Sequence, residues 1–129
     1  MDNLDVIREL ARRWNAGDMD EVIGLYAEDA VTRTGAHWPE QATYQGRDAI
    51  RASIEEWQSM WEMTLAEVDS LEEYGDKVVA TGAWQMRGRS SGVDGQMPIA
   101  ILFTIRDGKI ATLEWFPDRD HAVAAAHRA

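Results

Sequence analysis

The chain has 129 residues, enough for one domain with a sizeable core, and its balance of 45% hydrophobic and 28% charged residues is typical of globular proteins. The formal net charge of -10 would repel a phosphate backbone, which excludes nucleic acid as an expected partner. The chain contains no cysteine, which excludes disulfides and thiolate metal sites.

The N-terminal stretch, MDNLDVIREL, is acidic and amphipathic. It has neither the basic region nor the apolar run of a signal peptide. No segment of the sequence reaches the ~20 apolar residues that a membrane-spanning helix requires. We therefore expect a soluble, cytoplasmic protein without a membrane partner.

Helical periodicity predicts two helices at the start of the chain. Apolar residues recur at helical spacing from Leu4 to Trp14, and Gly17 provides a stop. Asp18 is placed to cap a second, shorter helix. The apolar face of that helix is expected to consist of Val22, Ile23, Leu25 and Tyr26. A short strand over residues 29–34 and a loop over residues 35–46 are expected to follow.

The third expected helix covers residues 47–61. Its apolar stripe consists of Ile50, Ile54, Trp57 and Trp61. After it the hydrophobic period changes from 3.6 to two, which predicts strands over residues 63–74, 77–89, 97–106 and 109–116. Asp118 is placed to cap a last, alanine-rich helix. Helices followed by a run of antiparallel strands indicate an α+β fold, and we expect one domain over residues 1–129.

Four short phrases carry a resemblance to a known family. They read NAGD at 15–18, LYAEDA at 25–30, YQGRDAI at 44–50 and RDGKI at 106–110. In this order they resemble the SnoaL-like branch of the nuclear transport factor 2-like (NTF2-like) superfamily over nearly the whole chain. The resemblance implies a cone, in which a curved antiparallel or mixed sheet wraps around N-terminal helices and leaves a pocket, commonly as a homodimer through the sheet. It implies no single activity, since the superfamily includes ketosteroid isomerases, polyketide cyclases, epoxide hydrolases, dehydratases and non-catalytic domains.

The isomerase members allow a test of individual positions. The resemblance places their oxyanion-hole tyrosine at Leu10, their general base at Thr34 and their protonated aspartate at Ala100 or Ile101. None of these side chains can move the proton that enolisation requires, so steroid-type isomerisation is disfavoured. For the cyclases, the resemblance leaves only Glu114 and Asp118 as carboxylates near the end of the last strand.

The chain has six tryptophans, more than a core of this size normally uses. Period-two alternation places one set of strand residues on the concave face: Val78, Ala80, Gly82, Trp84, Met86, Ile99, Ile101, Phe103, Ile105, Ala111, Leu113 and Trp115. We expect the ligand-binding wall to consist of Trp14, Trp38, Trp57, Trp61, Trp84, Met86, Ile101, Phe103 and Trp115. The alternative is that these side chains interlock in a solid core. The opposite face of the last strand, with Ile110, Thr112, Glu114 and Phe116, is also partly apolar and suggests a sheet-to-sheet dimer.

Two polar residues are candidates for catalysis. His37, beside Trp38 on a loop, could act as an acid or base, or could be an exposed loop histidine. Asp118 could act as a general base at the pocket mouth, or could be only the cap of the last helix. Glu114 is expected to be interfacial or solvated. The sequence lacks the histidine spacing of a metal site, so no metal is expected.

We therefore expect a protein that binds a hydrophobic, cyclic or aromatic small molecule. If it is an enzyme, cofactor-free acid/base chemistry is expected, such as cyclisation, isomerisation, dehydration or epoxide opening. The alternative is a non-catalytic ligand-binding or dimeric association domain. A third possibility is a stress or regulatory protein whose sheet face binds another protein.

Overall fold

The computed structural model describes residues 2–34 and 42–128, except for the side chains of residues 65–69. In chain order its elements are α1 (Asn3–Asn15), α2 (Met19–Ile23), β1 (Tyr26–Arg33), β2 (Thr43–Gln45), α3 (Arg47–Met60), β3 (Trp61–Tyr74), β4 (Lys77–Gly88), β5 (Asp94–Arg106), β6 (Lys109–Phe116) and α4 (Arg119–His127). Within the described residues, no helix is long and apolar enough to cross a membrane.

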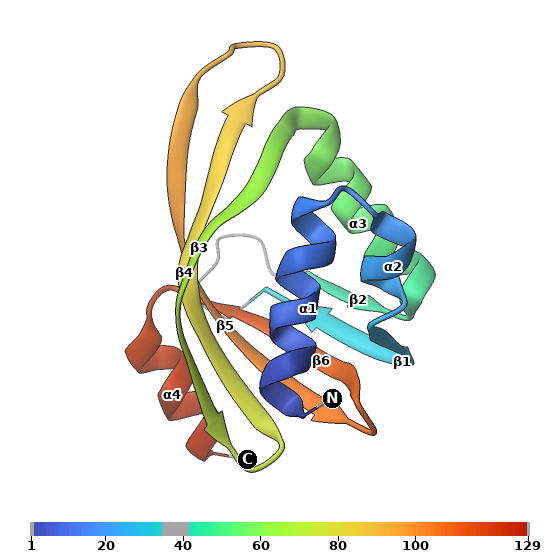
Figure 1. Cartoon of the computed structure of the whole chain (residues 1–129), viewed down its shortest axis with the longest axis vertical. Helices are drawn as coiled ribbons and strands as arrows, with labels where there is room; N and C mark the ends of the chain where they lie inside the picture. The colour runs from blue at the N-terminus through green and yellow to red at the C-terminus, as the bar shows by residue number, and fades with distance from the viewer. Residues whose placement is uncertain (1, 35–41, 129) are drawn as a thin grey trace.

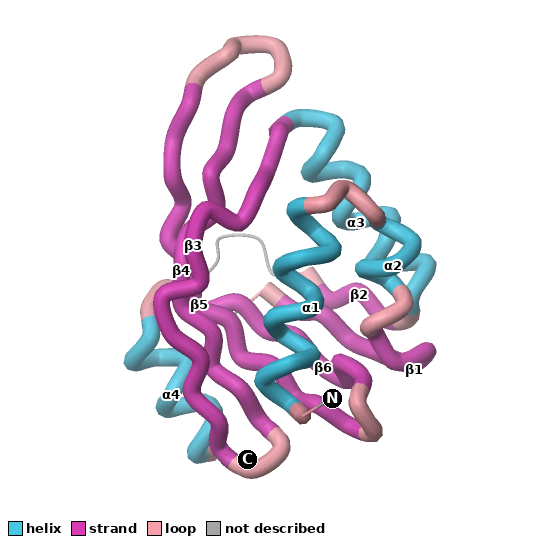
Figure 2. The backbone as a smooth tube through the Cα atoms, in the orientation of Figure 1, coloured by secondary structure: helices cyan, strands magenta, loops and turns pink. Residues whose placement is uncertain are grey.

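The strands form one mixed, curved sheet in the order β2-β1-β6-β5-β4-β3. Neighbouring strands are antiparallel except for β1 and β6, which run parallel. Helices α1, α2 and α3 lie on one side of the sheet and α4 lies on the other (Figure 1). The long hairpin of β4 and β5 bends as it extends past the helices (Figure 2). The α+β cone expected from the sequence is confirmed.

Aspartates begin three of the helices. The side chains of Asp2, Asp18 and Asp118 accept hydrogen bonds from backbone N–H groups three residues later, at 2.8, 3.2 and 2.9 Å. Each bond satisfies an amide that the first turn of a helix leaves without a partner. The expected caps at residues 18 and 118 are confirmed.

The region between α2 and α3 differs from the sequence-based expectation. The second helix ends at Ile23, so Leu25 and Tyr26 are not part of its face, and β1 begins at Tyr26 instead of residue 29. The cause is pairing with a distant strand, because the backbone N–H of Ile110 donates to the carbonyl of Leu25 at 2.8 Å. Strand β2 was expected to be loop, and it forms because Thr43–Gln45 pairs with residues 31–33.

Apolar side chains are buried on both faces of the sheet. The concave core includes Val6, Ile7, Ile50, Val78, Ile101 and Phe103, from helices and strands together. The opposite face buries Val79, Ala100, Leu102, Ala122 and Ala126, with Phe116 packed against them. Helix α4 therefore covers this face of the sheet, which the sequence had suggested would be covered by a partner subunit.

A bulge changes the expected faces of β6. Thr104 pairs with Thr112 and Ile105 pairs with Ile110, so Ala111 is an extra residue in this ladder. Ile110 consequently belongs to the concave core with Leu113, and its expected place on the other face was wrong.

Arg47 fixes the start of α3. Its Nε and Nη2 atoms donate to the backbone carbonyl of Tyr26 at 2.9 and 2.7 Å. The side chain thus ties the first residue of α3 to the first residue of β1. This contact positions α3 across the concave face of the sheet.

Candidate functional site

A cavity of about 680 Å³ lies between the helices and the concave face of the sheet. The helical side is formed by Ile7, Leu10, Ala11 and Trp14 of α1 and by Ile50, Ser53, Ile54, Trp57 and Met60 of α3. The sheet side includes Ala80, Gly82, Trp84, Ile99, Ile101, Phe103, Leu113 and Trp115. The rings of helix and sheet therefore do not fill the space between them.

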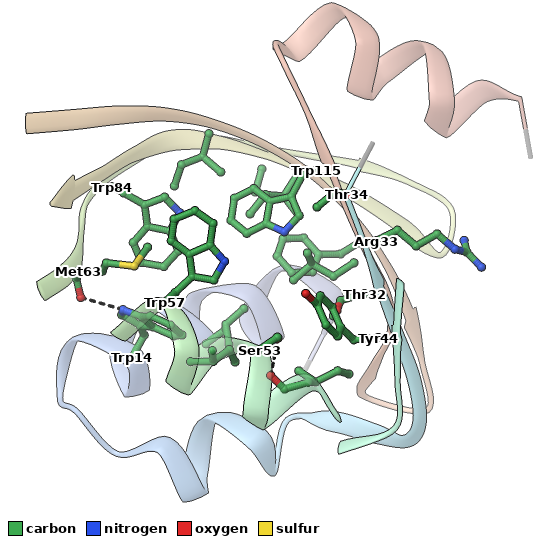
Figure 3. Close-up of a pocket in the computed structure, with 18 of the residues that line it drawn as sticks. Trp14, Thr32, Arg33, Thr34, Tyr44, Ser53, Trp57, Met63, Trp84 and Trp115 are labelled. Atoms are coloured by element: carbon green, nitrogen blue, oxygen red, sulfur yellow. Dashed lines mark hydrogen bonds between the residues drawn. The ribbon is translucent and has the colours of Figure 1, made fainter. Parts of the chain in front are cut away.

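Three indoles form a continuous wall of this cavity. The ring centroids of Trp14 and Trp84 are 5.0 Å apart at an interplanar angle of 57°. Those of Trp84 and Trp115 are 6.5 Å apart at 35°. A fourth indole, Trp57, faces them from α3 (Figure 3) and is 45% exposed, whereas Trp84 is only 6% exposed. Trp57 is therefore the most exposed of these four rings.

Most of the expected wall residues surround this space. Those that line the cavity are Trp14, Trp57, Trp84, Ile101, Phe103 and Trp115. Met86 and Trp61 are not among the lining residues. Along β4 the lining residues are Ala80, Thr81, Gly82 and Trp84, and Met86 follows them toward the hairpin tip. Trp61 pairs with Gly88, which lies still further along β4. His37 and Trp38 lie outside the described residues.

The positions matched to the isomerase machinery converge on the cavity. Leu10, Thr34 and Ile101 all line it, while Ala100 lies on the opposite face beneath α4. Of the two residues that the resemblance offers for the protonated aspartate, only Ile101 borders the cavity. The side chains of Leu10, Thr34 and Ile101 supply no acid or base.

The polar groups of the described lining are mainly uncharged. Burial raises the pKa of the Tyr26 phenol well above its ordinary value, so that group stays neutral. Tyr44 presents its ring to the cavity, whereas the Arg33 side chain points away (Figure 3). The lining also includes Glu56, whose side chain is exposed. The lining thus offers hydroxyl and indole groups for hydrogen bonding, in a largely apolar surface.

Two indole N–H groups in this wall differ in their partners. Trp14 Nε1 donates to the backbone carbonyl of Met63 at 3.0 Å. Trp84 Nε1 is buried and has no hydrogen-bond partner. Sequence reasoning placed both rings on the cavity, but it could not distinguish their hydrogen bonding.

The family model of the SnoaL-like domain matches residues 7–113 of this chain. The chain belongs to the SnoaL-like domain family. The resemblance inferred from the four sequence phrases is thus confirmed. No protein of curated function matches the sequence.

Solved structures share the fold of this SnoaL-like domain. An NTF2-like protein of unknown function from Burkholderia pseudomallei has a TM-score of 0.79 and 21% identity, over 96% of this chain and 97% of that one. TerC, co-crystallized with polyporic acid, has a TM-score of 0.77 and 19% identity, over 97% and 98% of the two chains. A proposed polyketide cyclase from Xanthomonas campestris has a TM-score of 0.77 and 17% identity, over 95% of each chain. At these identities the likeness shows the fold alone.

Asp118 lies away from the cavity of this SnoaL-like domain. Its carboxylate caps α4, on the opposite face of the sheet, and also lies 2.8 Å from Nδ1 of His121. The N–H of His121 and then its ring lower the pKa of the Asp118 carboxyl. This geometry fits the capping role, and it does not fit a base at the cavity mouth.

Glu114 is half-buried on β6 and does not line the cavity. The described residues contain no cluster of three or more side chains suited to hold a metal ion.

Proposed function

We propose that this SnoaL-like domain binds a hydrophobic, cyclic or aromatic small molecule between α1, α3 and the sheet. The observation that carries the proposal is the open space of about 680 Å³ walled by Trp14, Trp84 and Trp115. Cavities of ~300–1,000 Å³ are typical of small-molecule sites. The structural similarity to TerC, which was co-crystallized with polyporic acid, supports a ligand of this general kind.

The apolar lining favours a ligand with two or three rings. Burying about 200 Å² of apolar ligand surface contributes roughly 5 kcal/mol, from which the cost of association must be subtracted. Because 5 kcal/mol corresponds to a dissociation constant of about 0.2 mM before that cost is subtracted, apolar contact alone gives only weak, roughly millimolar binding. Additional hydrogen bonds would then decide which ring compound binds best.

Binding without catalysis is the form of this function that we favour. Apart from Glu56 and Arg33, the polar side chains of the described lining are hydroxyls and indoles. The alternative is cofactor-free acid/base catalysis, for which the fold of the proposed polyketide cyclase is the supporting similarity. His37 remains the candidate acid or base of that alternative. Turnover of a ring compound that disappears in His37→Ala would favour the enzyme.

Titration of the intrinsic tryptophan fluorescence with polycyclic and terpenoid compounds tests the binding proposal. We expect a saturable change from at least one compound, since four indoles line the cavity. Absence of saturation across the whole panel would contradict the proposal.

Two serines of α3 provide a matched pair of variants. Ser53 Oγ donates to the carbonyl of Ile50 at 2.7 Å, and Ser59 Oγ donates to the carbonyl of Glu56 at 2.6 Å. Only Ser53 lines the cavity. We expect Ser53→Phe to fill the space and weaken binding at least about tenfold, and Ser59→Phe to leave it unchanged. Equal effects of the two substitutions would place the binding site elsewhere.

Association as a homodimer through the sheet also remains a prediction. Helix α4 already covers Val79, Ala100 and Leu102, which weakens the reason for a partner on that face. Light scattering after size-exclusion chromatography distinguishes a dimer from the 14.5 kDa monomer.

A further inference from the structure

The indole nitrogen of Trp84 is the unusual group in this cavity wall. The side chain is 6% exposed, its ring lines the cavity, and its N–H is buried without a hydrogen-bond partner. The neighbouring indole of Trp14 shows the ordinary arrangement, because its N–H donates to Met63. No other buried side-chain nitrogen or oxygen in the described part of the chain is unpaired in this way.

An indole N–H can donate a hydrogen bond and cannot accept one. Native proteins pair most of their buried polar groups, because a buried group without a partner loses its hydration and gains nothing in return. A buried donor whose ring borders a cavity is therefore placed to be satisfied by an acceptor of the ligand.

The charges around the cavity indicate that this acceptor is neutral. The only cationic side chain of the described lining, Arg33, is exposed and points away from the cavity (Figure 3). An anionic ligand would lose its hydration there without gaining an opposite charge. The chain also carries a net charge of -10, which disfavours the approach of an anion.

We propose that the ligand carries an uncharged oxygen acceptor, such as the carbonyl of a ring ketone, quinone or lactone, and that Nε1 of Trp84 donates a hydrogen bond to it. This inference rests on the proposed function of the cavity and specifies the chemical class of its ligand. Because the nitrogen is screened from solvent, the acceptor reaches it by displacing side chains that surround the ring.

Three probes that share one carbon skeleton test the inference: tetralin, 1-tetralone and the 1-aminotetralin cation. Each is titrated by calorimetry into the wild-type protein. We expect 1-tetralone to bind about tenfold more tightly than tetralin, the contribution of one hydrogen bond to a donor that is otherwise unpaired. We expect the cation to bind no better than tetralin.

Replacing single tryptophans of the cavity by phenylalanine then identifies which indole donates the hydrogen bond to the ligand. We expect Trp84→Phe, which keeps an aromatic ring but removes the N–H, to abolish the preference for 1-tetralone over tetralin. Trp57→Phe is the matched control, because it also changes a ring of the cavity and should weaken both probes while retaining the preference. Loss of the preference in Trp115→Phe but not in Trp84→Phe would overturn the assignment to Trp84.

Nuclear magnetic resonance of the indole N–H groups detects the hydrogen bond itself. If Trp84 only packed against the ligand, its N–H signal would respond equally to 1-tetralone and tetralin. The Trp84 signal is identified by its absence in Trp84→Phe. It should move to higher frequency with 1-tetralone and much less with tetralin. Equal binding of tetralin and 1-tetralone would overturn this inference and leave the proposed function intact, as would tighter binding of the cation. Failure of all three probes and of the wider panel to bind would instead overturn the proposed function itself.

Discussion

Trp14 and Met63 join the first helix to the third strand through one hydrogen bond, from the indole Nε1 to the backbone carbonyl at 3.0 Å. The two residues are 49 positions apart in the chain. The bond fixes the indole of Trp14 so that its ring centroid lies 5.0 Å from that of Trp84. Trp14 therefore serves both the stability of the fold and the shape of the cavity wall.

Replacing Trp14 by phenylalanine should test this double role. The substitution removes the hydrogen bond to Met63 and part of a packed ring, so we expect the free energy of unfolding to fall by about 2 kcal/mol. Trp57→Phe makes the same change at a ring that is 45% exposed and should cost less than about 0.5 kcal/mol. Urea titrations followed by circular dichroism measure both values. Equal losses in the two variants would show that the Trp14 bond contributes nothing.

The contact between Arg47 and Tyr26, which positions α3 over the sheet, can be tested by its contribution to stability. Its two hydrogen bonds to the carbonyl of Tyr26 are partly buried, and we expect Arg47→Met to lower the free energy of unfolding by about 1–3 kcal/mol.

Arg51→Met, one turn later in α3, is the matched control for Arg47. Arg51 makes ion pairs with Asp20 and Glu55 that are exposed to solvent, so its replacement should have a much smaller effect. The same urea titrations apply. A larger loss in Arg51→Met than in Arg47→Met would contradict the anchoring role.

The overall architecture could be predicted because its signals are local. Helical spacing from Leu4 to Trp14 and the change to period two after residue 61 each depend on neighbouring residues, and both expectations are met. The caps at Asp18 and Asp118 likewise need only the residues of one turn. The family followed from phrases that lie mostly at helix ends and turns.

Features that depend on distant partners could not be predicted in the same way. Strand β2 and the first residues of β1 are set by pairing across the sheet. The bulge at Ala111 reverses the face of Ile110, and strict alternation could not show it. Alternation also could not show that Met86 lies beyond the part of β4 that lines the cavity. The unpaired N–H of Trp84 depends on three-dimensional packing and has no sequence signal.

The pH dependence of stability should distinguish capping by Asp118 from a catalytic role. The N–H and ring of His121 lower the pKa of this carboxyl below its ordinary value of 3.8. A group whose pKa is lower in the folded state stabilises the fold above its unfolded pKa, and this contribution is lost as the pH falls through the folded pKa. Asp118→Ala should therefore lower the unfolding temperature at neutral pH, with a difference from the wild type that shrinks in acid.

The variant Asp118→Asn is the matched control, because an asparagine side chain can still cap the helix but cannot titrate. Its advantage over Asp118→Ala should therefore persist in acid, when unfolding is followed by circular dichroism at each pH. Because Asp118 lies away from the cavity, both variants should bind ring compounds as the wild type does. A loss of ligand binding in Asp118→Asn would contradict this placement.

A crystal structure grown in the presence of 1-tetralone tests the central claim most directly, because it shows whether the space between the indoles is open. We predict a cavity of about 680 Å³ between the helices and the sheet, with electron density for the ring compound inside it, against Trp84 and Trp115. A space between α1, α3 and the sheet that is too small for the compound would contradict the proposed ligand site and leave a solid core.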